Sequence, residues 1–228
     1  LLLAARRHTP ERAHYPLMAD RPTEGSPFTL GVLPNDIVAQ GHNLTASWDI
    51  AEGLTVKSLT GYRKLSNFTY QNSFAGVFGP LGGSVLVFDQ DQDQFTQELQ
   101  AIGNALDGRL EYVVGAYYFD ESAESFDTTR PPRGLAVGLD RTVTTDNKAY
   151  ALYAQGTGRP TLLDGLYVTA GLRWSRDERR ATLNQTILPL AGAPIVRPPA
   201  EGDRSFSNVS PSLVVGYDVS EEVNVYAK

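Results

Sequence analysis

Residues 166–175, LYVTAGLRWS, decide the fold of this chain, because apolar and polar residues alternate through them one by one. One parity consists of Leu166, Val168, Ala170, Leu172 and Trp174, and the other consists of Tyr167, Thr169, Gly171, Arg173 and Ser175. A period of two places these sets on opposite faces of a β-strand. The stretch therefore predicts a strand between an apolar medium and an aqueous one.

The same alternation recurs on both sides of this stretch. It runs through residues 44–50, 54–63, 93–102, 110–118, 150–155 and 212–219, and begins again at 223–228. These runs predict about eight strands, and each is near the ~9–11 residues that cross a bilayer at a tilt. Aromatic residues lie near the strand ends and predict an interfacial girdle at each rim. They are Trp48, Tyr62, Tyr112, Tyr118, Phe119, Trp174 and Tyr217.

The connections between the strands are of two kinds. Short polar turns are predicted at residues 51–53, 104–108, 160–165 and 220–222, about 55 residues apart. Long irregular loops are predicted between them, at 66–88, 122–145 and 180–206. Short turns on one side and long loops on the other are typical of an outer-membrane barrel. The fold class is thus all-β, an antiparallel transmembrane β-barrel segment.

Composition excludes several other classes of protein. The net charge of −6 argues against a nucleic-acid partner, which would normally meet a basic face. The absence of cysteine excludes disulfides, thiolate metal sites and cysteine nucleophiles. No G-x-S-x-G, P-loop, H-E-x-x-H or dinucleotide-binding glycine motif is present. We therefore expect no enzyme activity, no cofactor and no metal site.

One acidic run resembles the opening of a calcium loop. Residues 89–94 read DQDQDQ, but Gln94 replaces the turn glycine and Gln100 replaces the bidentate glutamate. We interpret the run as the solvated top of a strand.

Six of these stretches, taken in order, resemble the barrel of TonB-dependent outer-membrane receptors. They are VKSLTGYR at 56–63, FTQELQ at 95–100, YVVGAYYF at 112–119, YALYAQG at 150–156, VTAGLRWSRD at 168–177 and residues 206–215. The resemblance implies a location in the bacterial outer membrane and a 22-stranded barrel plugged by an N-terminal domain. On this basis residues 1–40 are expected to be an irregular extracellular lead-in and 41–228 a partial barrel, without the plug and the C-terminal strands.

The resemblance also implies function. It implies energy-dependent uptake of a scarce nutrient, with ferric siderophores, haem, cobalamin or oligosaccharides as candidates. The implied partners are outer-membrane lipid and lipopolysaccharide, a small nutrient ligand, and the TonB-ExbB-ExbD system through the N-terminal region. Arg130 and Arg133 lie in a predicted loop and are candidates for ligand binding. Arg63, Glu98 and Arg173 are expected to face the lumen and to contact the plug.

Two other classes of protein remain open from the sequence. A passive porin would share the strand pattern but would have no plug. A soluble secreted β-rich protein, such as an adhesin or a carbohydrate-binding sandwich, would be extracted without detergent.

Overall fold

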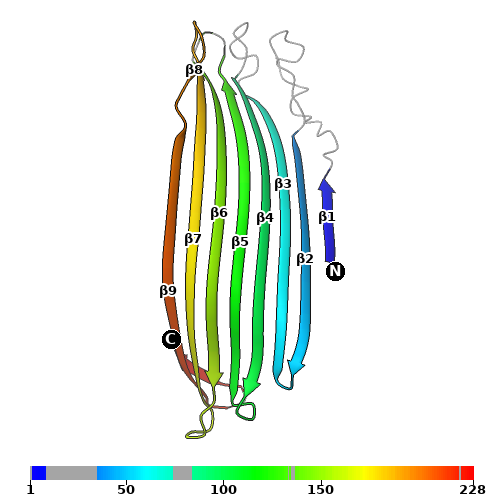
Figure 1. Ribbon diagram of the computed structural model, residues 1–228, viewed down its shortest axis with the longest axis vertical. Helices are drawn as coiled ribbons and strands as arrows, with labels where there is room; N and C mark the ends of the chain where they lie inside the picture. The colour runs from blue at the N-terminus through cyan, green and yellow to red at the C-terminus, as the bar shows by residue number, and fades with distance from the viewer. Residues whose placement is uncertain (1, 9–34, 74–83, 133, 135–136, 221) are drawn as a thin grey trace.

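The computed structural model describes the whole chain except residues 1, 9–34, 74–83, 133, 135–136 and 221. The described residues form ten strands in one antiparallel sheet, in which each long strand pairs with the next along the chain (Figure 1). They are β1 (Leu2–His8), β2 (Asp36–Ala51), β3 (Leu54–Ser73), β4 (Ser84–Ala105), β5 (Leu110–Arg130), β6 (Gly138–Gly158), β7 (Leu166–Leu188), β8 (Ile195–Val196), β9 (Ala200–Asp218) and β10 (Asn224–Ala227). The expected all-β antiparallel fold is confirmed.

Tight turns join the strands at the lower end of the sheet in Figure 1. They connect β2 to β3, β4 to β5, β6 to β7 and β9 to β10, as the sequence predicted. Gly53 has a φ of 72° in the first of these turns, in the left-handed region that glycine adopts at little cost. The backbone carbonyl oxygen of Gly53 accepts a hydrogen bond from the backbone N–H of Asn104 (2.9 Å), which joins this turn to the neighbouring strand.

The long strands continue much further than the alternating pattern predicted. The six from β3 to β7 and β9 contain 19 to 23 residues each. The expectation of irregular loops at 66–88, 122–145 and 180–206 is therefore wrong for most of the described residues in these ranges, which continue the β-ladder. Residues 74–83, 133 and 135–136 of the predicted loops lie outside the described residues. Polar residues occupy both parities there, so no apolar alternation marks the strands, yet the backbone can still pair.

The region before residue 41 also contains strand. β1 pairs with residues 37–43 of β2, and β2 begins at Asp36, so both enter the range expected to be irregular.

The sheet has an outer and an inner face, and the cross-strand register shows which residues share each. The outer face carries apolar side chains that are about half exposed, including Leu44 (52%), Leu99 (50%), Val114 (50%), Leu152 (58%) and Leu172 (54%). The inner face carries Glu98, Tyr153 and Arg173, among other polar groups. Exposed leucine and valine on one face and polar groups on the other fit lipid outside and water inside.

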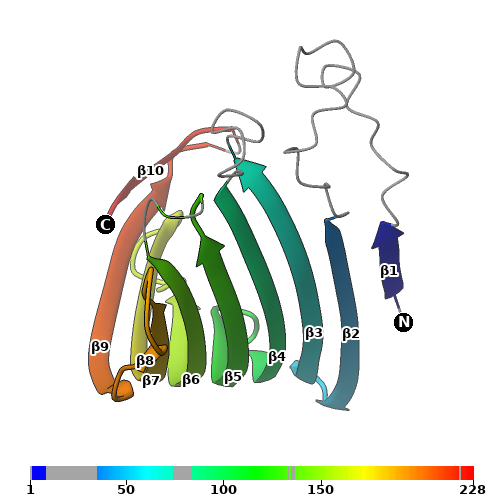
Figure 2. The same cartoon turned by 90° about the horizontal axis from the view of Figure 1, so that it is seen from above.

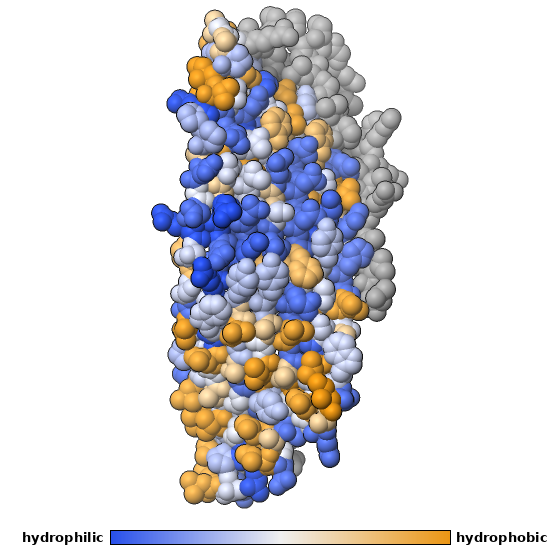
Figure 3. Space-filling view, viewed as in Figure 1, coloured by the Kyte–Doolittle hydropathy of each residue, from blue (hydrophilic) through white to orange (hydrophobic). Residues whose placement is uncertain are grey.

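The apolar part of the outer face occupies only half of each strand's length. We call the part from the tight turns up to the row Thr60, Gln97, Tyr118, Tyr150, Arg176 and Ser207 the lower half, and the remainder the upper half. In β5 the lower half spans residues 110–118, which at ~3.4 Å per residue and ~40° of tilt is about 21 Å tall, close to the ~25 Å apolar band of such barrels. In Figure 3 most apolar residues gather in the lower part of the view and a hydrophilic band crosses the middle, with a smaller apolar group near the top.

The sheet is curved and open, as seen from above in Figure 2. β1 and β10 lie at the two ends of the strand order. Ala151 is the one hydrophobic residue that is buried among the described residues. The chain therefore forms one layer of wall, and what matters for function is which groups each face of that wall presents.

Candidate functional site

The inner face of the lower half carries a hydrogen-bonded cluster. The Tyr153 hydroxyl donates to the Glu98 Oε1 (2.5 Å), and the Gln100 Nε2 donates to the same oxygen (2.9 Å). The Gln100 Nε2 also donates to the Tyr153 hydroxyl (3.1 Å), and the Arg173 guanidinium lies 5.9 Å from the centroid of the Tyr153 ring. Two predicted lumen-facing residues, Glu98 and Arg173, thus meet through a tyrosine to which the sequence assigned no role.

A glycine makes room for that tyrosine. Gly115 is the register partner of Tyr153, and a Cβ at Gly115 would overlap the Tyr153 ring. The ring crosses the neighbouring strand at this point and reaches Glu98 on the strand beyond it. Glycine at residue 115 therefore positions the cluster, because any side chain would displace the ring.

Arg63 lies on the same face but outside this cluster. The register partner of Arg63 is Gln94, whereas the register partner of Glu98 is Leu59. Arg63 therefore lies four residues further up β3 than the level of Glu98. The structure thus places all three predicted lumen residues on the inner face but brings only Glu98 and Arg173 together.

The inner face of the upper half is polar as well. Glu121 accepts hydrogen bonds from the Gln92 Nε2 (2.7 Å) and the Asn147 Nδ2 (2.9 Å), which links β4, β5 and β6. Further up, the Arg141 guanidinium forms a bidentate ion pair with Asp127, with a shortest distance of 2.6 Å. These side-chain bonds add to the backbone ladder that joins the strands of the upper half.

The structure describes one of the two predicted ligand-binding arginines. Arg133 lies outside the described residues. Arg130 shares the outer-face parity, and its two terminal nitrogens donate to Asp140 at 2.6 and 3.0 Å. The Arg130 guanidinium holds the pKa of the Asp140 carboxyl below its ordinary value, and the Thr128 hydroxyl adds to that effect. Arg130 therefore closes the β5–β6 hairpin, and its assignment to ligand binding stays a prediction.

A girdle of aromatic rings crosses the outer face where the two halves meet. Phe95 and Tyr118 have ring centroids 6.3 Å apart, and Tyr118 and Tyr150 have centroids 5.4 Å apart. Tyr62, the register partner of Phe95, extends the row. The expected girdle thus includes Tyr62 and Tyr118, whereas Phe119 is on the inner face, because neighbouring residues of a strand point to opposite sides.

Charged residues follow directly above this girdle on the outer face. Lys64 lies 3.9 Å from Asp93, Lys148 lies 3.7 Å from Asp120, and Arg176 lies 2.9 Å from Glu178. The acidic run at 89–94 contributes Asp93, whose carboxylate accepts a hydrogen bond from the Tyr62 hydroxyl (2.5 Å). An aromatic row capped by ion pairs is what the boundary between acyl chains and headgroups requires.

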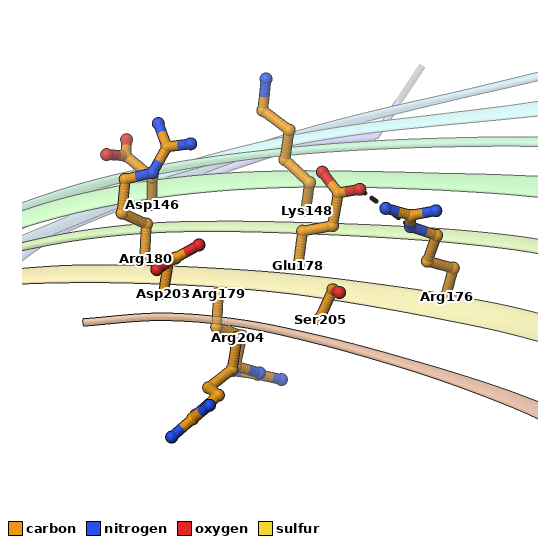
Figure 4. Close-up of a pocket in the computed structure, with 9 residues that line it drawn as sticks. All are labelled: Asp146, Lys148, Arg176, Glu178, Arg179, Arg180, Asp203, Arg204 and Ser205. Atoms are coloured by element: carbon orange, nitrogen blue, oxygen red, sulfur yellow. Dashed lines mark ion pairs between the residues drawn. The ribbon is translucent and has the colours of Figure 1, made fainter.

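A hollow of about 340 Å³ opens above the girdle between β6, β7 and β9. Figure 4 shows that most of its lining side chains, among them Asp146, Lys148 and Glu178, point to one side of the strands. Arg179 and Arg204 point to the other side. Sequence reasoning missed these two arginines, because nothing in the residues shows that β7 and β9 place them opposite each other.

The described residues hold no group of three or more His, Cys, Asp or Glu side chains that could bind a metal ion. Among the same residues, no helix is long and apolar enough to cross a membrane.

The curved meander, its short turns at one end, its lipid-type outer face and its aromatic girdle define a class of protein, the bacterial outer-membrane β-barrel. Within that class, residues 7–228 match the TonB dependent receptor-like β-barrel family. The chain belongs to this family and is a segment of a barrel in the bacterial outer membrane. The family takes part in nutrient uptake across that membrane.

Two solved structures share this fold. The ferric yersiniabactin uptake receptor FyuA from Yersinia pestis aligns with a TM-score of 0.68 at 18% identity, covering 84% of this chain and 27% of that one. The ferric citrate transporter FecA, in its unliganded form, aligns with a TM-score of 0.53 at 14% identity, covering 84% of this chain and 26% of that one. This chain thus spans about a quarter of either structure. A comparison with curated proteins finds no match.

Proposed function

We propose that this chain forms part of the wall of a receptor that binds a scarce nutrient outside the cell and imports it with energy from the inner membrane. The observation that supports the proposal is the family match over residues 7–228. The geometry agrees with it, because the inner face is polar and hydrogen-bonded at bilayer depth and continues upward as a polar wall. Both solved relatives are described as handling ferric chelates, which favours iron chelates over haem, cobalamin or oligosaccharides.

The proposal assigns roles to the predicted residues. Arg63, Glu98 and Arg173 face the lumen and are proposed to contact the plug domain of the full-length receptor. Arg133 remains a proposed ligand contact. The ion pairs above the girdle are proposed to lie among lipopolysaccharide headgroups. Coupling to the TonB-ExbB-ExbD system is proposed to occur through the N-terminal region of the full-length protein.

Uptake by the full-length receptor tests the proposal. Cells that express it should accumulate iron-55 from at least one ferric chelate, and they should lose that uptake when TonB is deleted or the proton gradient is collapsed. A passive porin would transport without TonB and would conduct ions steadily in a planar bilayer. Uptake that persists without TonB, together with steady conductance, would contradict the receptor proposal and favour the porin.

A further inference from the structure

Two tyrosines of the inner face cross a neighbouring strand at a glycine. The Tyr153 ring, which belongs to β6, lies over Gly115 in β5. The Tyr167 ring, which belongs to β7, lies over Gly216 in β9 in the same way. An added Cβ at either glycine would overlap the tyrosine that crosses it. Each tyrosine therefore needs a register partner without a side chain.

Both hydroxyl groups reach the strand beyond the glycine. The Tyr153 hydroxyl donates to the Glu98 Oε1 in β4 (2.5 Å). The Tyr167 hydroxyl lies 3.1 Å from the Asn224 Oδ1 and 3.0 Å from the Asn224 Nδ2 in β10. Because β4, β5 and β6 are neighbours in the sheet, and so are β7, β9 and β10, each tyrosine links three strands.

An arginine accompanies each tyrosine. The Arg173 guanidinium lies 5.9 Å from the centroid of the Tyr153 ring, and the Arg159 guanidinium lies 5.4 Å from that of the Tyr167 ring. A cation at this distance is attracted to the face of an aromatic ring. The same arrangement of tyrosine, glycine and arginine thus occurs twice in the wall, which indicates a common role.

The alternation of apolar and polar residues does not fix the register of the strands completely. A slip by one residue would turn every side chain to the other face, whereas a slip by two residues would keep the faces. On the inner face of β5, Gly115 lies between Val113 and Tyr117, so a slip by two residues would place a side chain under the Tyr153 ring. The neighbours of Gly216 on the inner face of β9 carry side chains as well.

We propose that Tyr153 and Tyr167 fix the register of the barrel wall, because each ring fits only where its glycine lies opposite. The bilayer selects the face of each residue, and the two tyrosines select among the registers that share this face. Gly115 is the one glycine in β5, so Tyr153 has a single position along that strand. The hydroxyl bond to the next strand extends the same register to a third strand.

Gly156 provides a matched control, because it also has a tyrosine as its register partner. That partner is Tyr112, whose ring lies over Gly103 on the other side. A Cβ built on Gly156 would be 3.5 Å from its nearest neighbour, the Leu110 Cδ1, which is an ordinary contact. An alanine should therefore be tolerated at residue 156 but not at residue 115.

Unfolding of the full-length receptor in phosphatidylcholine vesicles tests the fit between ring and glycine. The variants are G115A, Y153A, the double variant and the control G156A. With Tyr153 present, G115A should raise the equilibrium constant of unfolding by about tenfold, as an overpacked site predicts. In the Y153A background the same substitution should change it by less than about twofold, and G156A should be close to neutral.

An exchange of two residues tests the register itself. V113G/G115V moves the glycine by two residues on the same face of β5 and leaves the composition unchanged. Disulfides report the register in a background without other cysteines, since bridged residues must lie directly opposite. V114C with A154C reports the native register, and V114C with L152C reports the slip that would bring residue 113 opposite Tyr153.

The exchange should replace the native disulfide by the slipped one, and Y153A should restore the native one. If the exchange abolishes folding, as shown by normal migration on unheated gels, Y153A should restore folding. The proposal is overturned if the exchanged protein keeps the native disulfide and the stability of the wild type, or if Y153A rescues neither property. It is also overturned if G115A costs as much without Tyr153 as with it, or if G156A costs as much as G115A.

Discussion

The lower and upper halves of the same strands are stabilised in different ways. In the lower half the outer face is mostly apolar, with Leu99, Val114, Leu152 and Leu172 exposed to the surroundings. Its polar residues Ser58, Thr60 and Gln97 hydrogen-bond one another. In the upper half the outer and inner faces are both polar, and side chains are joined by hydrogen bonds and ion pairs such as Asp127–Arg141 and Arg130–Asp140. Lipid therefore constrains most outer residues of the lower half, whereas polar side chains of the upper half pair between neighbouring strands.

A charge placed on the outer face should give the largest difference in stability between the two halves. Leu152→Arg puts a guanidinium among acyl chains and should destabilise the full-length barrel by about 2–4 kcal/mol. Thr144→Arg is eight residues higher on the same strand and face, beside the acidic register partner Glu124, and should change stability by less than about 0.5 kcal/mol. Guanidinium-induced unfolding in phosphatidylcholine vesicles measures both variants. Equal losses would show that lipid does not surround residue 152.

Glycine substitutions on the inner face should give the next largest difference. Gly115→Val forces the Tyr153 ring away from Glu98 and should cost about 1–3 kcal/mol as an overpacked site. Gly202→Val enters open space in the upper half and should be close to neutral. Unfolding in vesicles compares the two. If Gly202→Val costs as much stability as Gly115→Val, the space for the Tyr153 ring is not the reason for glycine at residue 115. Backbone conformation would then explain glycine at both positions.

The smallest effect is expected at the top of the β5–β6 hairpin. Asp140→Asn weakens the pair with Arg130 and should cost about 0.2–1 kcal/mol, as for other partly exposed ion pairs. The carboxyl pKa of Asp140 is lowered in the fold, so its stabilisation is complete above the ordinary value of 3.8 and is lost as the pH falls through the lowered pKa. Hydrogen-exchange protection of residues 128–130 and 138–140 should fall with acid in the wild type.

The Asn variant is the control for that experiment, because it has no carboxyl to titrate at residue 140. Its hairpin amides should start less protected and should show a smaller change with pH. An identical acid response in both proteins would remove Asp140 as the cause. Amides of the lower half, such as those of residues 112–116, should keep their protection in either case.

The lower half was predictable from the sequence to a large extent. Residues 166–175 and 110–118 assign each side chain to a face by parity alone, and the short turns at 51–53 and 104–108 were placed correctly. Glu98 and Arg173 were placed on the lumen side for the same reason. The alternation is strong there because lipid on one side and water on the other impose opposite requirements on successive residues.

The upper half was predicted poorly because that contrast is missing. Residues 122–130 and 180–188 continue as strand although their sequence reads as loop, and Arg130, expected in a loop, is paired across the hairpin. The sequence placed Tyr153 on the correct face but gave it no role, since its hydroxyl bonds to Glu98 and Gln100 of β4, two strands away in the sheet.

By itself, therefore, the sequence determined the class of fold, the face of each lower-half residue and the end of the sheet that carries the short turns. These features depend on the medium on each side of a strand, and the alternation of apolar and polar residues reflects that medium. The tertiary structure alone decided how far the strands run and which side chains meet across them. Register joins residues separated by loops of variable length, and no local pattern records that Arg179 lies opposite Arg204.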